Sequence, residues 1–131
     1  MIIIFNKCKN SNQQGAIGLG QAVSYFTRQR CIVSLPLIDA QDYDLIVDNL
    51  VCLNKVQVKT TNHKEGKHYQ VNLVNGSHSS RKNIKLNTEK VYEFLFVLTG
   101  ADEVFVIPKQ EIEHLKTSIT LSDKYSKYKV S

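Results

Sequence analysis

Two stretches in which apolar and polar residues alternate constrain the fold of this chain more than any other feature. In the first, residues 43–48, leucine and valine point to one side of an extended strand and Asp44 to the other. The second, residues 51–60, follows a short connection at Asn49 and Leu50, where asparagine is suited to a positive φ. Two neighbouring strands of this kind predict an antiparallel hairpin with one apolar and one polar face.

The polar face of this hairpin carries side chains that are candidates for chemistry. In the second strand Val56 and Val58 face the core, whereas Gln57 and Lys59 share the opposite face, roughly 7 Å apart. Pairing of the strands brings Asp44 beside this face, so that a carboxylate, an amide and an ammonium group lie together at one sheet edge. A hard cation held by oxygen ligands, with a lysine beside it, is suited to the hydrolysis of a phosphodiester.

The same alternation is also typical of an ordinary hairpin with one solvated face. The distribution of acidic residues favours the chemical interpretation. The first 64 residues contain only four carboxylates, and all of them fall within ten positions: Asp39, Asp42, Asp44 and Asp48. An acidic centre in basic surroundings suits a cation site that a polyanion must approach.

The chain is basic, and its excess charge is concentrated in one segment. Its formal net charge is +5 and its sequence pI is about 9.1. Residues 61–92 contribute +4, because they contain six basic residues and two acidic ones. A solvated surface loop is one interpretation of this segment, and contact with a polyanion is the other. The candidates for contacts to phosphate groups are Lys64, Lys67, Arg81, Lys82 and Lys85.

Residues 13–30 favour a helix, because apolar residues recur there near helical spacing and arginines follow at the C-terminal end. The apolar stripe is predicted at Ile17, Ala22, Val23 and Phe26. Three glycines in its first turns suit close packing against a sheet, or a backbone approached by a ligand.

The remaining patterns predict an α/β fold with a mixed central β-sheet flanked by helices. The run 93–98 is almost continuously apolar, which is typical of a strand covered on both faces. At 131 residues the chain is predicted to form one domain, residues 1–131. Further strands are predicted at residues 31–35, 67–74 and 103–108, and a short helix at 110–115.

Asp44, the Gln57-Val58-Lys59 triplet and the glycine-rich helix resemble the PD-(D/E)XK nuclease superfamily, over roughly residues 13–110. The triplet is similar to the QxK variant, which includes homing endonucleases encoded in bacterial group I introns. The resemblance implies a restriction-endonuclease-like fold in which Asp44 binds Mg²⁺, for which Mn²⁺ can substitute. It further implies that the Gln57 amide oxygen and the Val58 carbonyl assist in holding the metal, and that Lys59 acts on water or on the transition-state phosphate.

One position departs from the superfamily pattern. Its members often carry a glutamate on the first helix that completes the metal site, but residues 14–22 contain no acid. Gln21 is the only polar side chain predicted to be well placed inside this helix. Asp48, on the same strand as Asp44, is either a water-mediated contributor to the site or a solvated strand end.

These patterns, together with the homing or intron-associated type that the resemblance implies, lead us to expect a metal-dependent DNA endonuclease that cuts double-stranded DNA as a homo-oligomer. Two alternatives stay open: a structure-selective nuclease such as a Holliday-junction-like resolvase, and a catalytically inactive nuclease-fold DNA-binding module. No run of about 18 apolar residues is present to span a membrane. The first five residues lack the pattern of a signal peptide, so we expect a cytoplasmic protein.

Overall fold

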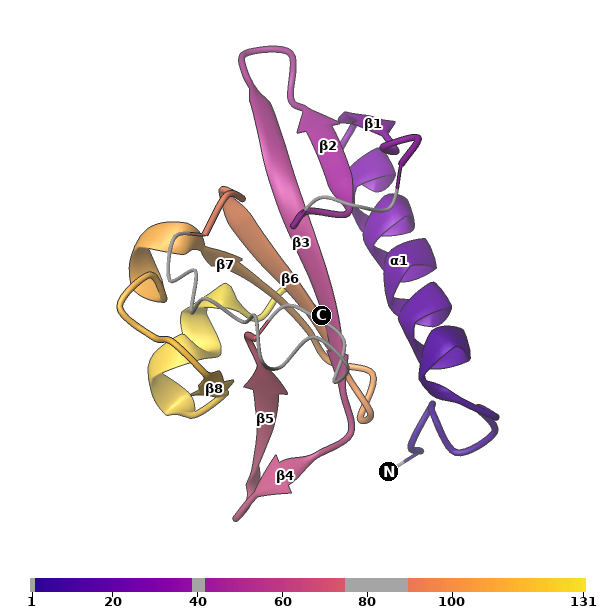
Figure 1. Ribbon diagram of the computed structural model, residues 1–131, viewed down its shortest axis with the longest axis vertical. Helices are drawn as coiled ribbons and strands as arrows, with labels where there is room; N and C mark the ends of the chain where they lie inside the picture. The colour runs from indigo at the N-terminus through magenta and orange to yellow at the C-terminus, as the bar shows by residue number, and fades with distance from the viewer. Residues whose placement is uncertain (1, 39–41, 75–89) are drawn as a thin grey trace.

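The structure, a computed structural model, describes residues 2–38, 42–74 and 90–131. The strands of its main sheet are β1 (Ile32–Ser34), β2 (Leu45–Asp48), β3 (Leu53–Thr61), β6 (Phe94–Thr99) and β7 (Val104–Pro108). They lie in the order β1-β2-β3-β6-β7 (Figure 1). Because β3 and β6 run parallel while the other neighbouring pairs are antiparallel, the sheet is mixed, and this prediction is confirmed.

One face of the main sheet is covered by the helix α1 (Ser11–Arg28), as Figure 1 shows. The Asn10 side chain caps its first turn by accepting a hydrogen bond at 3.0 Å from the backbone three residues later. The stripe that faces the sheet contains Gly18, Ala22 and Phe26, spaced by four residues. No helix in the described part of the chain, α1 included, is long and apolar enough to cross a membrane.

Gly18 sets how closely α1 approaches the sheet. A Cβ atom at this position would collide with the Thr60 side chain and lie 3.4 Å from Val58 Cγ1. The predicted helix is confirmed, but its buried stripe runs through Gly18, whereas Ile17 is exposed. The helix therefore lies directly over the two β3 residues that flank Lys59.

The other face of the main sheet is covered by a second layer. This layer consists of the 3-10 helix η3 (Asp123–Tyr128) and a small sheet with the order β4-β5-β8 (Figure 1). The small strands are β4 (Lys64–Glu65), β5 (His68–Asn72) and β8 (Ser118–Thr120). Val71, Ile119 and Tyr125 belong to the same buried cluster as Leu95 of β6. The apolar strand β6 is thus covered on both faces, as predicted, and the second covering layer is built mainly from strands.

The turn of the β2–β3 hairpin differs from the prediction. It spans residues 49–52, and the positive φ of 73° is taken by Leu50 rather than by Asn49. The Asn49 side chain instead accepts hydrogen bonds at 2.9 Å from the N–H groups of Val51 and Cys52. Asparagine therefore stabilises this turn through its side chain and not through its backbone conformation.

The C-terminal part of the chain also differs from the sequence prediction. The helix predicted at residues 110–115 is wrong: a short 3-10 turn, η2 (Lys109–Glu111), occupies its beginning. The last residues are docked, because the Val130 N–H donates to the Val104 carbonyl oxygen at 2.8 Å. The C-terminal end thereby adds to the free edge of β7.

Candidate active site

Asp44 lies immediately before β2 and stays paired with β3. Its N–H donates to the Val56 carbonyl oxygen at 2.8 Å, which extends the antiparallel β2–β3 pairing by one residue. Its carboxylate Oδ2 accepts a hydrogen bond from the Val58 N–H, also at 2.8 Å. The carboxylate is therefore fixed against the β3 backbone at the residue between Gln57 and Lys59.

Gln57 is a buried polar side chain on the face of β3 that the second layer covers. It pairs in register with Leu95, and only 9% of the residue is exposed. Its Oε1 atom is buried, and no donor among the described residues reaches it. A buried acceptor without a hydrogen bond costs about 1–3 kcal/mol, so it calls for a ligand or another explanation. An ordinary solvated strand face does not describe this position.

Lys59 lies two residues further along the same face of β3 and is half-buried. Burial lowers the pKa of its ammonium group below the ordinary value of 10.5, while the charges of Asp44 and Asp42 act in the opposite direction. Its proton is therefore held less firmly than that of an exposed lysine. A desolvated ammonium group of this kind can donate a proton or a hydrogen bond to a phosphate oxygen.

The oxygen atoms that these paired segments carry are of the kind that a hard divalent cation prefers. The Asp44 carboxylate and the unpartnered Gln57 oxygen come from paired segments, and the Val58 carbonyl belongs to the backbone beside them. Mg²⁺ and Mn²⁺ prefer carboxylate, amide and carbonyl oxygens as ligands. Within the described residues, no group of three or more His, Cys, Asp or Glu side chains could hold a metal. A metal site here would depend on one carboxylate supplemented by neutral oxygens.

The helix α1 brings an apolar side chain to this site, not an acid. A hollow of about 270 Å³ opens beside Asp44, and α1 contributes Leu19 to its wall. Gln21, which the sequence favoured, is exposed. The amide that reaches the sheet is Gln14, whose Nε2 donates to Thr60 Oγ1 at 3.1 Å. Gln14 lies one helical turn before the sheet-facing Gly18, and this spacing was the sequence signal that could have indicated it.

Two further acids near the hairpin have structural roles. Asp48 Oδ1 accepts a hydrogen bond from the Leu50 N–H at 2.8 Å, so this carboxylate caps the hairpin turn. Glu93 accepts a hydrogen bond from the Lys55 N–H, and its own N–H donates to the Lys55 carbonyl oxygen at 2.9 Å. Glu93 thereby joins the beginnings of the parallel strands β3 and β6.

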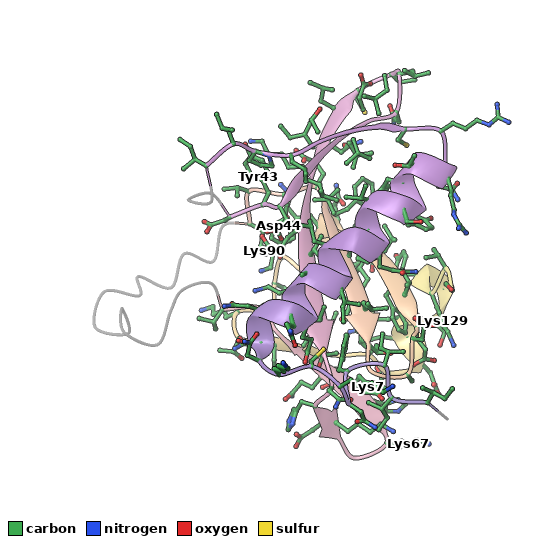
Figure 2. The ribbon with its side chains drawn as sticks, turned by 90° about the vertical axis from the view of Figure 1, so that its right-hand side faces the viewer. Lys7, Tyr43, Asp44, Lys67, Lys90 and Lys129 are labelled. Atoms are coloured by element: carbon green, nitrogen blue, oxygen red, sulfur yellow. The ribbon has the colours of Figure 1, made fainter. Side chains whose placement is uncertain are left out.

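Two of the predicted basic contacts, Lys64 and Lys67, are not among the residues that line the hollow beside Asp44. Lys64 belongs to β4, and Lys67 directly precedes β5 in the same hairpin. Figure 2 shows Lys67 at the lower end of the molecule, below Asp44. The other three candidates, Arg81, Lys82 and Lys85, fall outside the described residues.

Lys55 is a basic residue near the site, and it was not among the predicted phosphate contacts. It shares the face of Gln57 and Lys59, and its Nζ lies 5.2 Å from the centre of the Tyr43 ring. The period of two along β3 was the available signal, because it places every second residue from Lys55 on one face. The missed lysine extends positive charge along the strand toward the hairpin turn.

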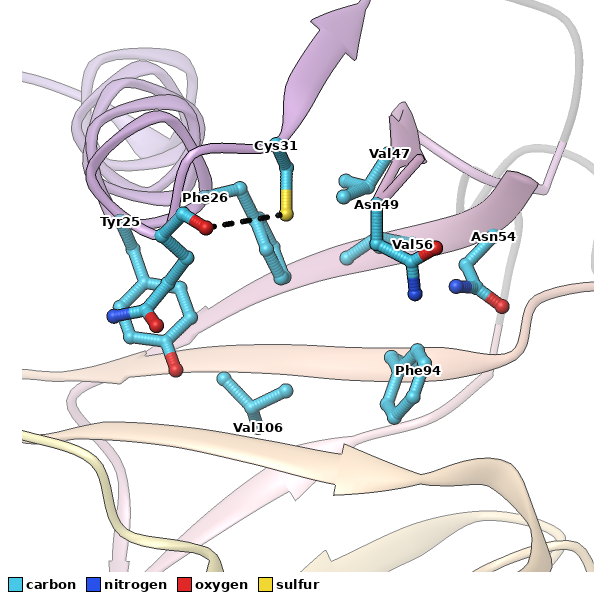
Figure 3. A pocket seen from close by; sticks show the side chains of 10 residues that line it. Tyr25, Phe26, Cys31, Val47, Asn49, Asn54, Val56, Phe94 and Val106 are labelled. Atoms are coloured by element: carbon cyan, nitrogen blue, oxygen red, sulfur yellow. Dashed lines mark hydrogen bonds between the residues drawn. The ribbon is translucent and has the colours of Figure 1, made fainter. Parts of the chain in front are cut away.

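A second cavity lies on the face of the sheet that α1 covers. It has a volume of about 200 Å³ and is lined largely by apolar and aromatic side chains, among them Tyr25, Phe26 and Phe94 (Figure 3). Its floor includes Val56, whose side chain points away from the Gln57 face. Because none of the candidate site residues lines it, this cavity is not the candidate active site.

The comparisons with known proteins bear on the family and on the fold. A family model described as PD-(D/E)XK endonuclease matches residues 9–129. A search of curated protein sequences gave no match. Among solved structures, the bacterial homing endonuclease I-Ssp6803I is similar with a TM-score of 0.68 and 20% sequence identity, over 92% of this chain and 88% of that chain. At this identity the likeness bears on the fold, which is thereby confirmed as restriction-endonuclease-like. The family match spans most of the sequence, and the chain therefore belongs to the PD-(D/E)XK endonuclease family.

Proposed function

We propose that this protein is a metal-dependent DNA endonuclease, of homing or intron-associated type, that hydrolyses phosphodiester bonds. Its proposed active-site residues are Asp44, Gln57 and Lys59. The observation that carries the proposal is the buried Gln57 oxygen, which no donor among the described residues reaches, on a strand that orients the Asp44 carboxylate and carries the half-buried Lys59. Membership of an endonuclease family supports DNA as the substrate. The similarity of the fold to a bacterial homing endonuclease supports the homing type.

Each residue has a distinct role in this proposal. Asp44 and Gln57, with the Val58 carbonyl, would hold Mg²⁺, for which Mn²⁺ can substitute. When bound, such an ion lowers the pKa of water and neutralises charge on the phosphate. The Val58 N–H keeps the Asp44 carboxylate in one orientation. Lys59 donates a proton or a hydrogen bond to the phosphate oxygens as negative charge develops on them.

We also propose that the protein acts on DNA as a homo-oligomer. Cutting a duplex requires two strands to be hydrolysed, which a symmetric homo-oligomer with two engaged sites accomplishes economically. Sedimentation of the protein alone and on duplex DNA measures the number of copies. We also propose a cytoplasmic location, which cell fractionation would test.

The dependence on one carboxylate favours one alternative function, a catalytically inactive nuclease-fold DNA-binding module. Duplex binding without cleavage in either Mg²⁺ or Mn²⁺ would identify such a module. A Holliday-junction-like resolvase would instead cut branched DNA and be indifferent to sequence. Parallel assays on linear duplex and on four-way junctions separate these functions.

Replacing Gln57 with glutamate should strengthen metal binding. The substitution adds a second carboxylate beside Asp44, and two nearby carboxylates repel one another until a cation neutralises them. We therefore expect the Gln57→Glu variant to melt at a lower temperature without metal and to show a larger increase in melting temperature with Mn²⁺. Differential scanning calorimetry with and without Mn²⁺ measures both effects.

The matched control for this variant is Gln57→Leu, which removes the oxygen with little change in volume. It should lose both the metal-dependent stabilisation and cleavage. Because the substitution removes a buried acceptor that no donor among the described residues reaches, the free energy of unfolding should increase by about 1 kcal/mol. A Gln57→Leu variant that keeps the wild-type response to Mn²⁺ would contradict the assignment of Gln57 as a metal ligand.

Neutralising the basic segment should weaken DNA binding by an amount that depends on salt. If Arg81, Lys82 and Lys85 contact phosphates, replacing all three with glutamine should reduce the slope of log affinity against log salt by roughly 2.7, since each contact contributes about 0.9. The double variant of Lys64 and Lys67 should reduce it by roughly 1.8. Fluorescence anisotropy across a salt series measures the slopes. An unchanged slope would show that the segment concerned is only solvated surface.

A further inference from the structure

The loop formed by residues 35–38, which follow β1, presents apolar side chains to solvent. Leu35 and Ile38 are 60% and 67% exposed, and Leu37 is fully exposed. None of the residues 35–38 carries a charge or a polar side chain. Adjacent exposed apolar side chains are typical of an interaction surface rather than of an ordinary loop.

This loop forms one wall of the hollow beside Asp44. Leu35, Pro36 and Ile38 line the hollow together with Tyr43 and Asp44. A DNA phosphate held at Asp44 would bring its own deoxyribose and the neighbouring bases against the same wall. The loop therefore lies where the DNA must pass if the proposed function is correct.

We propose that the Leu37 side chain inserts between base pairs of duplex DNA beside the scissile phosphate, with Leu35 and Ile38 packed against deoxyribose. This inference rests on the proposed function, because it takes the position of the DNA from the Asp44 site. Leucine offers nothing to phosphate oxygens, but leucine and isoleucine side chains that enter a base step from the minor groove unstack it and kink the duplex. Pro36 restricts the loop backbone, so little conformational freedom is lost on insertion.

A second group of exposed apolar side chains supplies a comparison within the same chain. The hairpin turn presents Leu50 and Val51, and Val51 is 91% exposed. The turn follows β2, whereas Asp44 precedes it, so the length of this strand separates the turn from the candidate active site. Val51 is thus an exposed apolar residue that we do not expect to reach the DNA base step, and it serves as the control for Leu37.

The experiment compares Leu37→Ser with Val51→Ser, each in a chain that also carries Asp44→Asn to prevent cutting. Each protein is bound to a closed circular plasmid, which is then relaxed by a metal-independent topoisomerase, and the linking number is measured after protein removal. Binding to a labelled duplex is measured by anisotropy, and the number of copies by sedimentation. Both substituted side chains are exposed, and circular dichroism melting verifies that the variants fold.

We expect the Asp44→Asn chain to lower the linking number, because an unstacked base step unwinds the duplex. Leu37→Ser should abolish this change and weaken duplex binding about tenfold, the loss expected for partial burial of one leucine. Val51→Ser should leave both unchanged. Equal linking numbers with and without Leu37 would overturn the inference. A change in the number of copies on Leu37→Ser would overturn it as well, because the loop would then be a contact between subunits.

The test of Leu37 insertion and the test of the proposed function give separate answers. Cleavage by the unmodified chain in Mg²⁺ or Mn²⁺ tests the endonuclease alone. Cleavage without unwinding would overturn only the insertion of Leu37. Unwinding without cleavage would overturn only the catalytic proposal and leave a DNA-kinking protein.

Discussion

Replacing Asp44 with asparagine is expected to abolish cleavage while leaving the fold intact. Asparagine retains an oxygen that can accept the hydrogen bond from the Val58 N–H but lacks the charge that attracts a cation. A catalytic metal ion supplies several kcal/mol of transition-state stabilisation, and about 1.4 kcal/mol corresponds to tenfold in rate. The loss should therefore be at least about 10³-fold in single-turnover cleavage at saturating enzyme.

Asp48→Asn is the matched control for this variant. Asp48 undergoes the same chemical change at the far end of β2, but its carboxylate caps the hairpin turn by accepting a hydrogen bond from the Leu50 N–H. An asparagine can keep that hydrogen bond, so cleavage should stay near the wild-type rate. Asp44→Ala is less informative, because it leaves the Val58 N–H without its partner and destabilises the sheet edge by about 1–3 kcal/mol. Metal-dependent cleavage by Asp44→Asn at the wild-type rate would contradict the site assignment.

Replacing Lys59 with methionine is expected to separate activity from stability. Methionine has a similar length but can donate neither a proton nor charge to a phosphate, so cleavage should fall by at least about 10²-fold. Burial lowers the pKa of Lys59, which means that the fold disfavours its charged form. The Lys59→Met variant should accordingly melt at the wild-type temperature or above it. Wild-type turnover by this variant would show that Lys59 has no part in the chemistry.

The pH dependence of the wild-type rate tests the same role independently. Because the pKa of Lys59 lies below 10.5, the protonated form is lost at lower pH than for an exposed lysine. If the proton is required, the rate should fall as the pH rises through this lowered pKa. Asp42 raises the pKa, so Asp42→Asn should move the decline to lower pH. A rate that increases through the same range would assign Lys59 the role of a base.

The parts of the fold and site that could be predicted are those determined by neighbouring residues. The period of two along β2 and β3 predicts that Gln57 and Lys59 share a face, and the register of the hairpin places Asp44 beside them. The continuous apolar sequence of β6 predicts burial on both faces. Such patterns are local, because strand geometry fixes the direction of successive side chains.

What could not be predicted depends on residues far away in the chain. The face that carries Gln57 is buried because β5 and β8 supply Val71 and Ile119 to the layer above it. No pattern near Gln57 shows that cover, so the sequence left a solvated face open as an alternative. The close approach of Gly18 to Thr60 is similar, since a glycine contributes nothing to an apolar pattern. In the first case tertiary packing converts a polar strand face into a desolvated one.

The desolvated arrangement also suits the proposed site with its single carboxylate. Electrostatic interactions are stronger where water is excluded, so one oriented carboxylate and one neutral oxygen attract a cation better there than on an exposed face. The same exclusion of water makes the Lys59 proton easier to transfer. The absence of an acid in residues 14–22 is thus compatible with the proposed catalysis, with a metal affinity below that of a site with two carboxylates.

The most direct test of the central claim is the incubation of DNA with the unmodified protein in Mg²⁺, Mn²⁺ and EDTA. The substrates are supercoiled plasmids that carry fragments of the genome encoding the chain, together with a four-way junction. The account predicts nicked and linear products in the presence of Mg²⁺ or Mn²⁺, none in EDTA, and none from the Asp44→Asn variant. Bound but uncut DNA in both metals, or cleavage that persists undiminished in EDTA, would contradict it.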